Sequence, residues 1–262
     1  MIDYHIHTKL CKHADGEMHE YIESAIQTGL SEIAFTDHIP LPNKFDTEHR
    51  MYFDEMETYL NWIDKNKSQY PEIRILTGIE ADYISCYEEF LDDFINKYPF
   101  DIVIMSVHFI KNWPDSHWVF DYSFPDRNQN DIFDEYVNEI IKGIRTKLFD
   151  VLGHVDLIKL PGQSLIKDIP EKTDELLKEM SASGMTIEIN TSGFRRDIQE
   201  SYPGFDWLKA IIENEISITT GSDAHRPDQI ALKFDLLYQE LRKKDIQSIT
   251  GFRKRKKIDI SI

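Results

Sequence analysis

Short β-prone segments recur along this sequence and alternate with longer stretches that have helical spacing of apolar residues, which is the pattern of a parallel α/β fold. In the first helical stretch, Tyr21, Ile22, Ala25 and Ile26 share one face, and Gly29 is placed to end the helix in a left-handed conformation. Strands joined through helices are parallel and have right-handed crossovers. Seven segments have strand character: Ile2 to His7, Glu32 to Asp37, Ile73 to Glu80, Asp101 to His108, Phe149 to His154, Met185 to Asn190 and Ile216 to Asp223.

The chain length is compatible with closing such a sheet, because its 262 residues are near the roughly 250 that a TIM-like barrel uses. No internal repeat, low-complexity tract or Pro/Gly/Ser-rich linker divides the sequence, so we expect one domain over residues 1–262. The remaining helices are predicted over Glu55 to Gln69, Glu88 to Lys97, Ile132 to Leu148, Glu171 to Ser183, Trp207 to Asn214 and Pro227 to Lys243.

Charge and hydropathy narrow the class of partner. The net charge of −17 disfavours a nucleic-acid partner, because proteins bind nucleic acids largely by neutralising phosphates with basic side chains. A small phosphorylated substrate remains compatible with this charge if basic side chains are concentrated at the binding site. The basic run from Arg253 to Lys257 is expected to be a solvated loop or edge strand. No apolar run is long enough to span a membrane and no secretory signal precedes the first strand, so we expect a cytoplasmic protein without a membrane partner.

The two cysteines, Cys11 and Cys86, are too few for a disulfide framework. They suit a reducing compartment, and we expect both to be buried free thiols. Cys11 lies two residues before His13, but no second Cys/His pair with zinc-finger spacing follows.

Residues that can bind a metal gather at the ends of the predicted strands. Side chains two apart on a strand point the same way, so His5 and His7 form half of a possible site. One of the seven strand candidates, Met185 to Asn190, ends instead at an asparagine. The carboxyl ends of barrel strands share one face, where active sites are built. The other six segments end in, or are followed at once by, such residues: His5, His7, Asp37, His38, Glu80, His108, His154, Asp223 and His225.

Each of these residues also has an ordinary structural interpretation when taken alone. One His-x-His pair is a weak signal, His154 could be a hydrogen-bonded structural residue, and Glu80 could be a solvated strand end. Together in one barrel mouth they would be costly unless they bound something cationic. Imidazole and carboxylate ligands suit zinc, manganese, iron or cobalt, and their number exceeds the four that one zinc ion uses. The sequence therefore predicts two or three ions with a bridging carboxylate, an arrangement suited to phosphate-ester hydrolysis.

These motifs resemble the PHP superfamily (polymerase and histidinol phosphatase), in the order of that family and across nearly the whole chain. Two longer stretches resemble its histidinol-phosphatase branch: Asn190 to Arg195 followed by Tyr202-Pro203, and Ser222 to Pro227. The motifs that carry the wider resemblance are His5-Ile6-His7-Thr8, Thr36-Asp37-His38, Gly78-Ile79-Glu80, Ser106-Val107-His108, Gly153-His154-Val155-Asp156 and Gly221-Ser222-Asp223-Ala224-His225.

The resemblance implies a distorted (β/α)7 barrel with a trinuclear metal centre. The metal would be zinc, manganese or iron, and we expect zinc. It also implies hydrolysis of L-histidinol phosphate to L-histidinol and phosphate, a step of histidine biosynthesis, by a hydroxide that bridges the metal ions and attacks phosphorus in line. The ligand sets that it implies are His5, His7, Glu80 and Asp223 for the first ion, His13, His38 and His225 for the second, and bridging Glu80 with His108 and His154 for the third.

Four further residues are candidates for catalysis or substrate binding. Arg195, just after a strand end, is the candidate phosphate clamp, because a guanidinium matches phosphate with two parallel hydrogen bonds. Lys159 could add a second positive charge or simply be solvated. Asp37 could orient a metal ligand, which we favour, or act as an acid toward the leaving alkoxide. Trp113 or Trp118 could stack on an imidazole, or pack their loop onto the barrel.

The sequence departs from the branch pattern in two places. Met105 precedes Ser106 where a glycine is usual, and the irregular segment from Asn112 to Asn130, expected over the barrel mouth, contains a long insertion. Substrate choice therefore stays open between histidinol phosphate and another small phosphomonoester or a phosphoprotein. A non-catalytic metal-bound accessory module of a polymerase is the alternative from another class. We expect a monomer or a weak homo-oligomer.

Overall fold

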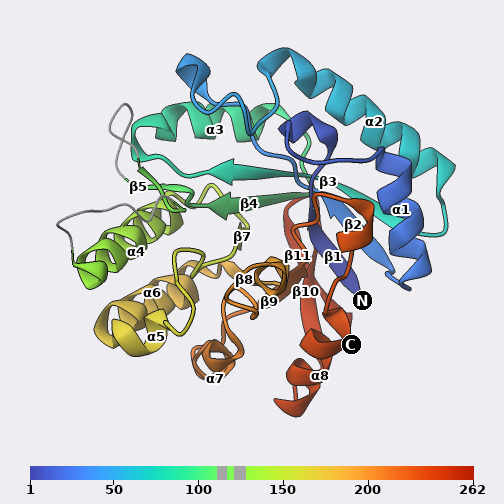
Figure 1. Ribbon diagram of the computed structural model, residues 1–262. Helices are drawn as coiled ribbons and strands as arrows, with labels where there is room; N and C mark the ends of the chain where they lie inside the picture. The colour runs from blue at the N-terminus through green and yellow to red at the C-terminus, as the bar shows by residue number, and fades with distance from the viewer. Residues whose placement is uncertain (111–116, 121–127) are drawn as a thin grey trace.

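The main sheet consists of seven parallel strands that follow one another in sequence order around a barrel (Figure 1). The computed structural model describes residues 1–110, 117–120 and 128–262. Neighbouring strands pair in parallel throughout, and Figure 1 shows the helices around the outside of the strands. The strands are β1 (Ile2–Ile6), β2 (Glu32–Phe35), β3 (Arg74–Asp82), β4 (Ile102–Ser106), β7 (Val151–Leu152), β8 (Thr186–Asn190) and β9 (Ile218–Gly221).

The sheet curls so that its first and last strands meet. The His7 amide donates to the Ala224 carbonyl at 2.9 Å, and the Ala224 amide donates to the His5 carbonyl at 3.2 Å. These bonds follow the end of β9, so the barrel closes at the mouth to which both strands point. The seven predicted strands and the TIM-like (β/α)7 barrel are confirmed.

Eight helices are present in the described part of the chain. The expected left-handed conformation of Gly29 is confirmed by its φ of 76°. The last helix begins later than predicted, because Pro227–Gln229 forms a 3-10 turn and Lys233 has a φ of 66°. The helices are α1 (Met18–Gln27), α2 (Met56–Gln69), α3 (Glu88–Lys97), α4 (Gln129–Thr146), α5 (Leu165–Asp168), α6 (Pro170–Ser183), α7 (Leu208–Glu213) and α8 (Phe234–Lys243).

A C-terminal hairpin, which sequence analysis did not predict, contains the basic run. Arg253 binds Glu32 at the start of β2, with a distance of 2.9 Å between Nη1 and Oε2, and Arg255 Nε donates to Asp150 Oδ2 at 2.7 Å just before β7. The run forms the hairpin turn and the strand ends beside it, in line with the expected loop or edge strand, but Arg253 and Arg255 are ion-paired instead of solvated because acidic groups at the amino ends of the barrel strands bind them. A second short hairpin lies near the barrel mouth. The hairpin strands are β10 (Ser248–Arg253) with β11 (Lys256–Ser261), and β5 (Phe109–Ile110) with β6 (His117–Trp118).

Met105, where the resemblance leads one to expect glycine, is buried in β4 and packs against α4. Gly143 of that helix provides the space, since a Cβ there would lie 2.4 Å from the Met105 sulfur. The departure is thus accommodated in the layer between the sheet and α4.

The two cysteines differ in environment. Cys11 is a buried free thiol as expected, whereas Cys86 is exposed, so that part of the prediction is wrong. Cys86 lies in the 3-10 turn Ser85–Tyr87, which precedes α3 on the outside of the barrel. Among the described residues, no helix has both the length and the apolar character to cross a membrane.

Candidate metal centre

Glu80 lies at the middle of a cluster of histidines at the barrel mouth. Its Oε2 is 3.2 Å from His5 Nε2, 3.4 Å from His7 Nε2 and 2.9 Å from His38 Nδ1. Its Oε1 faces the other side, 3.0 Å from His154 Nε2 and 3.8 Å from His108 Nε2. Each carboxylate oxygen therefore faces a separate set of imidazoles, as a bridging ligand requires.

Asp223 adds a second carboxylate on the side of His7. Its Oδ1 lies 3.2 Å from His7 Nε2 and 3.9 Å from His5 Nε2. Asp223 has a φ of 52°, and this left-handed turn after β9 directs the side chain back to the histidines of β1. The first and last strands of the barrel thus contribute to one group of donors.

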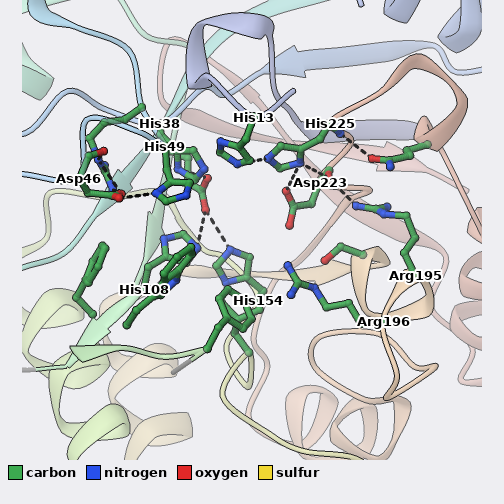
Figure 2. Close-up of a pocket in the computed structure, with 18 residues that line it drawn as sticks. His13, His38, Asp46, His49, His108, His154, Arg195, Arg196, Asp223 and His225 are labelled. Carbon is green, nitrogen blue, oxygen red and sulfur yellow. Dashed lines mark hydrogen bonds and ion pairs between the residues drawn. The ribbon is translucent and has the colours of Figure 1, made fainter. Parts of the chain in front are cut away.

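His13 and His225 face each other at the rim of the mouth (Figure 2). Their Nε2 atoms are 2.9 Å apart, while His13 Nδ1 lies 2.8 Å from the Cys11 carbonyl and His225 Nδ1 lies 3.0 Å from the Asp223 carbonyl. A carbonyl only accepts, so each Nδ1 carries a proton and each Nε2 presents a lone pair. Two lone pairs directed at one point fit a pair of metal ligands.

The buried donor atoms of the cluster fit metal ions. In the described structure six nitrogen and oxygen atoms of these residues are buried without a hydrogen-bond partner: His5 Nε2, His7 Nδ1, His7 Nε2, His38 Nδ1, Glu80 Oε2 and His154 Nδ1. Leaving such atoms buried and unpaired is costly, and coordination removes the cost. The potential ligand atoms of His5, Glu80 and His154 all lie within 4.8 Å of one another, as do those of His5, His7 and Asp223 and those of His7, His38 and His225.

The electrostatics of the centre keep the carboxylates ionised and some imidazoles neutral. Burial alone would raise the pKa of Glu80, but the nearby histidines, His38 first, hold it well below its usual range. Burial lowers the pKa of His38, and burial with the neighbouring His7 lowers that of His225 well below its usual value. Anionic carboxylates beside neutral imidazoles are the protonation states that metal binding requires.

A layer of carboxylates holds the histidines from behind. Glu188 Oε1 lies 2.8 Å from His5 Nδ1, and Asp82 Oδ1 lies 2.7 Å from His108 Nδ1. Both carboxylates are buried, so each fixes a tautomer that leaves Nε2 for the metal. Sequence analysis missed both, although Glu188 alternates with Asn190 on β8 and therefore shares its face.

Asp37 lies in the same layer. Its Oδ1 is 3.5 Å from His7 Nδ1, its Oδ2 accepts from the Thr8 amide at 3.3 Å and from the Thr8 hydroxyl, and its side chain is buried. This placement behind His7 supports the orienting role over that of an acid for the leaving group.

A cavity of about 610 Å³ opens above the cluster. Arg195 and Arg196 lie on one side and Asp46 and His49 on the other, with the metal-binding candidates between them (Figure 2). Sequence analysis missed Arg196, Asp46 and His49. These residues lie in turns, where the sequence has no strand or helix periodicity that would indicate the direction of a side chain. The lining residues used below are His49, Phe109, Trp118, Arg195 and Arg196.

The two arginines differ in what holds them. Arg195 Nη1 donates to the Ser222 carbonyl at 2.8 Å and Nη2 to the Asp223 carbonyl at 2.7 Å. The Arg196 guanidinium lies 4.4 Å from the centre of the Phe120 ring, and none of the described carboxylates is paired with it. In a protein of net charge −17, two such cations beside the metal cluster make a local anion site.

Lys159 is not brought to this cavity. Its side chain is buried, and its Nζ donates to Asp156 Oδ2 at 2.8 Å and to the Ser201 carbonyl at 2.9 Å, and lies 3.0 Å from Glu200 Oε1. Asp156 and Glu200 neutralise the positive charge of the lysine. We therefore assign Lys159 a structural role instead of the predicted contact with substrate. Trp113, the other predicted substrate contact, lies outside the described residues.

Comparison with known proteins places this centre in a family. The model of the PHP domain matches residues 3–192, which is most of the chain. The chain belongs to the PHP domain family. The similarity covers nearly the whole chain in a curated relative from Deinococcus radiodurans. This relative is named "Probable histidinol-phosphatase" and is 31% identical over 98% of both chains. The Bacillus subtilis relative "Histidinol-phosphatase" is 29% identical over 89% of this chain and 96% of its own.

Solved structures share the PHP barrel. The histidinol phosphate phosphatase of Lactococcus lactis, complexed with zinc, L-histidinol and phosphate, superposes with a TM-score of 0.85 at 22% identity and covers 98% of both chains. A structure from Listeria monocytogenes superposes with a TM-score of 0.81 at 23% identity and covers 90% of this chain and 99% of its own. These structures show that the chain has the PHP barrel, and at its mouth lie groups of histidines and carboxylates that could hold metal ions.

Proposed function

We propose that this protein hydrolyses L-histidinol phosphate to L-histidinol and phosphate and that it uses two or three divalent metal ions at the barrel mouth. Zinc is the metal that we expect. The support comes from full-length relatives with that name and from the Lactococcus lactis structure, which holds zinc, L-histidinol and phosphate. The observation that carries the proposal is the position of Glu80 between two sets of histidines, beside a cavity with two arginines.

The proposed ligands follow the contacts around the two carboxylates. Candidates that surround Glu80 Oε2 and Asp223 would hold the first ion, and those around Glu80 Oε1 would hold the third. The facing pair at the rim belongs to the second ion. The assignments are His5, His7, Glu80 and Asp223, then His13, His38 and His225, then Glu80, His108 and His154.

Bound ions would supply Lewis acidity toward the phosphoryl oxygens and lower the pKa of a water molecule. The side chains do the positioning. Glu188 and Asp82 hold the rings of His5 and His108 so that their Nε2 atoms face the cluster, while Asp37 places a carboxylate 3.5 Å from His7 Nδ1.

Arg195 and Arg196 bind the phosphate dianion of the substrate at the side of the cluster. Arg196 contributes through its guanidinium, which is paired with none of the described carboxylates, and Arg195 through the donors that remain after two backbone carbonyls have been bound. Because Arg195 also holds the backbone of Asp223, it couples the anion site to the metal centre.

A second candidate is a phosphatase with another small monoester as its substrate. A Thermoanaerobacter relative named "Probable phosphatase Teth514_1060" is 28% identical over 86% of this chain and 79% of its own, and its name specifies phosphatase activity without a histidinol substrate. For the main candidate we further propose one domain over residues 1–262, cytoplasmic location, no nucleic-acid partner and a monomeric or weakly associated state, consistent with the acidic charge.

Steady-state kinetics test the proposal. The metal-loaded protein is assayed on L-histidinol phosphate beside small monoesters and a phosphopeptide, and we expect the highest kcat/KM for L-histidinol phosphate. A higher kcat/KM for another ester would favour the second candidate, and no turnover of any ester would favour a non-catalytic module.

A further inference from the structure

Aromatic side chains line the cavity beside the metal ligands. The His49 and Trp118 rings are 4.8 Å apart, and Trp118 stacks with Phe109 at 6.4 Å between ring centres. Phe109 is supported from behind by Phe45 at 4.7 Å. We call His49, Phe109 and Trp118 the aromatic wall. It is formed by the β5–β6 hairpin and by the turn before α2.

His49 is the one described histidine of the cavity lining that the proposed metal ligand sets do not use. Its Nδ1 lies 2.6 Å from Asp46 Oδ1, and Arg50 in turn binds Asp46 Oδ2 at 2.6 Å and Asp82 Oδ2 at 3.0 Å. Asp82 holds His108, so His49 is tied to the metal centre through a chain of ion pairs. This chain gives the imidazole a fixed position relative to the cluster.

The tautomer of His49 follows from this support. A carboxylate accepts, so Nδ1 carries the proton, and in the described part of the chain Nε2 has no hydrogen-bond partner. The side chain is 32% exposed, which leaves Nε2 accessible from the cavity. Trp118 is 38% exposed, an unusual state for a tryptophan beside a polar cluster. The wall thus offers an aromatic face and a hydrogen-bond acceptor side by side.

We propose that His49 and Trp118 select the organic group of the substrate. A planar nitrogen heterocycle stacks on Trp118 and donates its N–H to His49 Nε2. The phosphate lies toward Arg195 and Arg196, which Figure 2 shows across the cavity from His49. The inference rests on the proposed function and deepens it, because the imidazole of L-histidinol phosphate is such a ring. A ring donor that meets an oriented acceptor gives discrimination against substrates that lack it.

The test compares two substrates with the same amino-alcohol phosphate head. L-Histidinol phosphate has the imidazole, and O-phosphoethanolamine lacks it. The variants are His49→Ala, Trp118→Ala and the conservative Trp118→Phe, with His19→Ala on the exposed face of α1 as matched control. Inhibition by L-histidinol and by inorganic phosphate is measured in parallel, together with the bound metal.

We expect either alanine variant to raise KM for L-histidinol phosphate and Ki for L-histidinol by about tenfold, since one aromatic or hydrogen-bonded contact is worth about that factor. The kcat/KM for O-phosphoethanolamine, the Ki for phosphate and the metal content should stay unchanged, and Trp118→Phe should keep most of the preference. An equal fall in kcat/KM for both substrates, or an unchanged Ki for L-histidinol, would overturn the role of the aromatic wall but not the proposed function. A parent enzyme with no preference for L-histidinol phosphate would overturn the proposed function together with it.

Discussion

His5 Nδ1 and Glu188 Oε1 are 2.8 Å apart inside the barrel, although the two residues belong to β1 and β8. Both side chains are buried, and the Glu188 Oε2 atom also accepts from the His154 amide at 3.1 Å. One carboxylate therefore supports two proposed metal ligands from strands far apart in the sequence. The metal centre depends on barrel closure as much as on the ligands themselves.

Removing this support should weaken metal binding without removing a ligand. We expect Glu188→Gln to lower metal affinity by about 10- to 100-fold, because an amide orients the imidazole less well than a carboxylate. Elemental analysis after dialysis against graded chelator measures the loss. Glu171→Gln on the exposed face of α6 is the control. Equal metal retention in both variants would show that Glu188 is not a positioning residue.

Gly221 gives a second way to disturb the same pair. A Cβ at this position would lie 1.9 Å from Glu188 Oε1 and 2.6 Å from the His5 Cβ, so Gly221→Ala must push both aside. We expect a loss of about 1–3 kcal/mol in the free energy of unfolding, typical of overpacking, together with weaker metal binding. Chemical denaturation and elemental analysis report the two effects. Gly162→Ala, where no atom lies within 4 Å of the added Cβ but a φ of 83° strains an alanine, should lower stability without changing the bound metal.

The two cavity arginines should separate in their effects on metal. Arg196→Ala removes a cation that touches no metal-ligand backbone, so KM should rise about tenfold or more while metal content stays constant. Arg195→Ala also removes the bonds to the carbonyls of Ser222 and Asp223, so both kcat/KM and metal retention should fall. Kinetics with elemental analysis distinguish them. Full metal retention in Arg195→Ala would reduce its role to phosphate binding.

The basic hairpin should affect stability alone. Arg253→Ala loses the bonds to Glu32 at the amino ends of the strands, which should cost about 1–3 kcal/mol in the free energy of unfolding. Because the hairpin binds the end of the barrel opposite the metal centre, kcat/KM should not change. Lys254→Ala, at the exposed turn, is the control in denaturant titrations. A fall in kcat/KM of the folded Arg253 variant would contradict this separation.

The fold could be predicted from sequence because its signal is local. Strand-like segments such as Arg74–Asp82 are bounded by amphipathic helices, and their order alone sets a parallel barrel. The candidate ligands followed from their positions at strand ends, since all parallel strands point to one mouth. Hairpin β10–β11 was missed because its basic turn resembles a solvated loop unless its acidic partners are known to be near.

The remaining parts of the site depend on contacts between distant residues. The pairing of His49 with Asp46 lies within one turn, but its position beside Trp118 follows from how that turn packs on the β5–β6 hairpin. Lys159 follows a proposed ligand in sequence just as Arg195 follows a strand end. Only tertiary structure shows that Asp156 and Glu200 bind the lysine.

Stepwise metal reconstitution tests the central claim most directly. The protein is stripped with chelator, titrated with zinc, and assayed on L-histidinol phosphate at each step while bound zinc is counted. We predict no turnover without metal, and activity that rises with bound zinc and reaches a plateau at two or three ions per chain, as expected for a clustered hydrolytic site. Undiminished turnover in the stripped protein, or full zinc binding without hydrolysis of L-histidinol phosphate, would contradict the account.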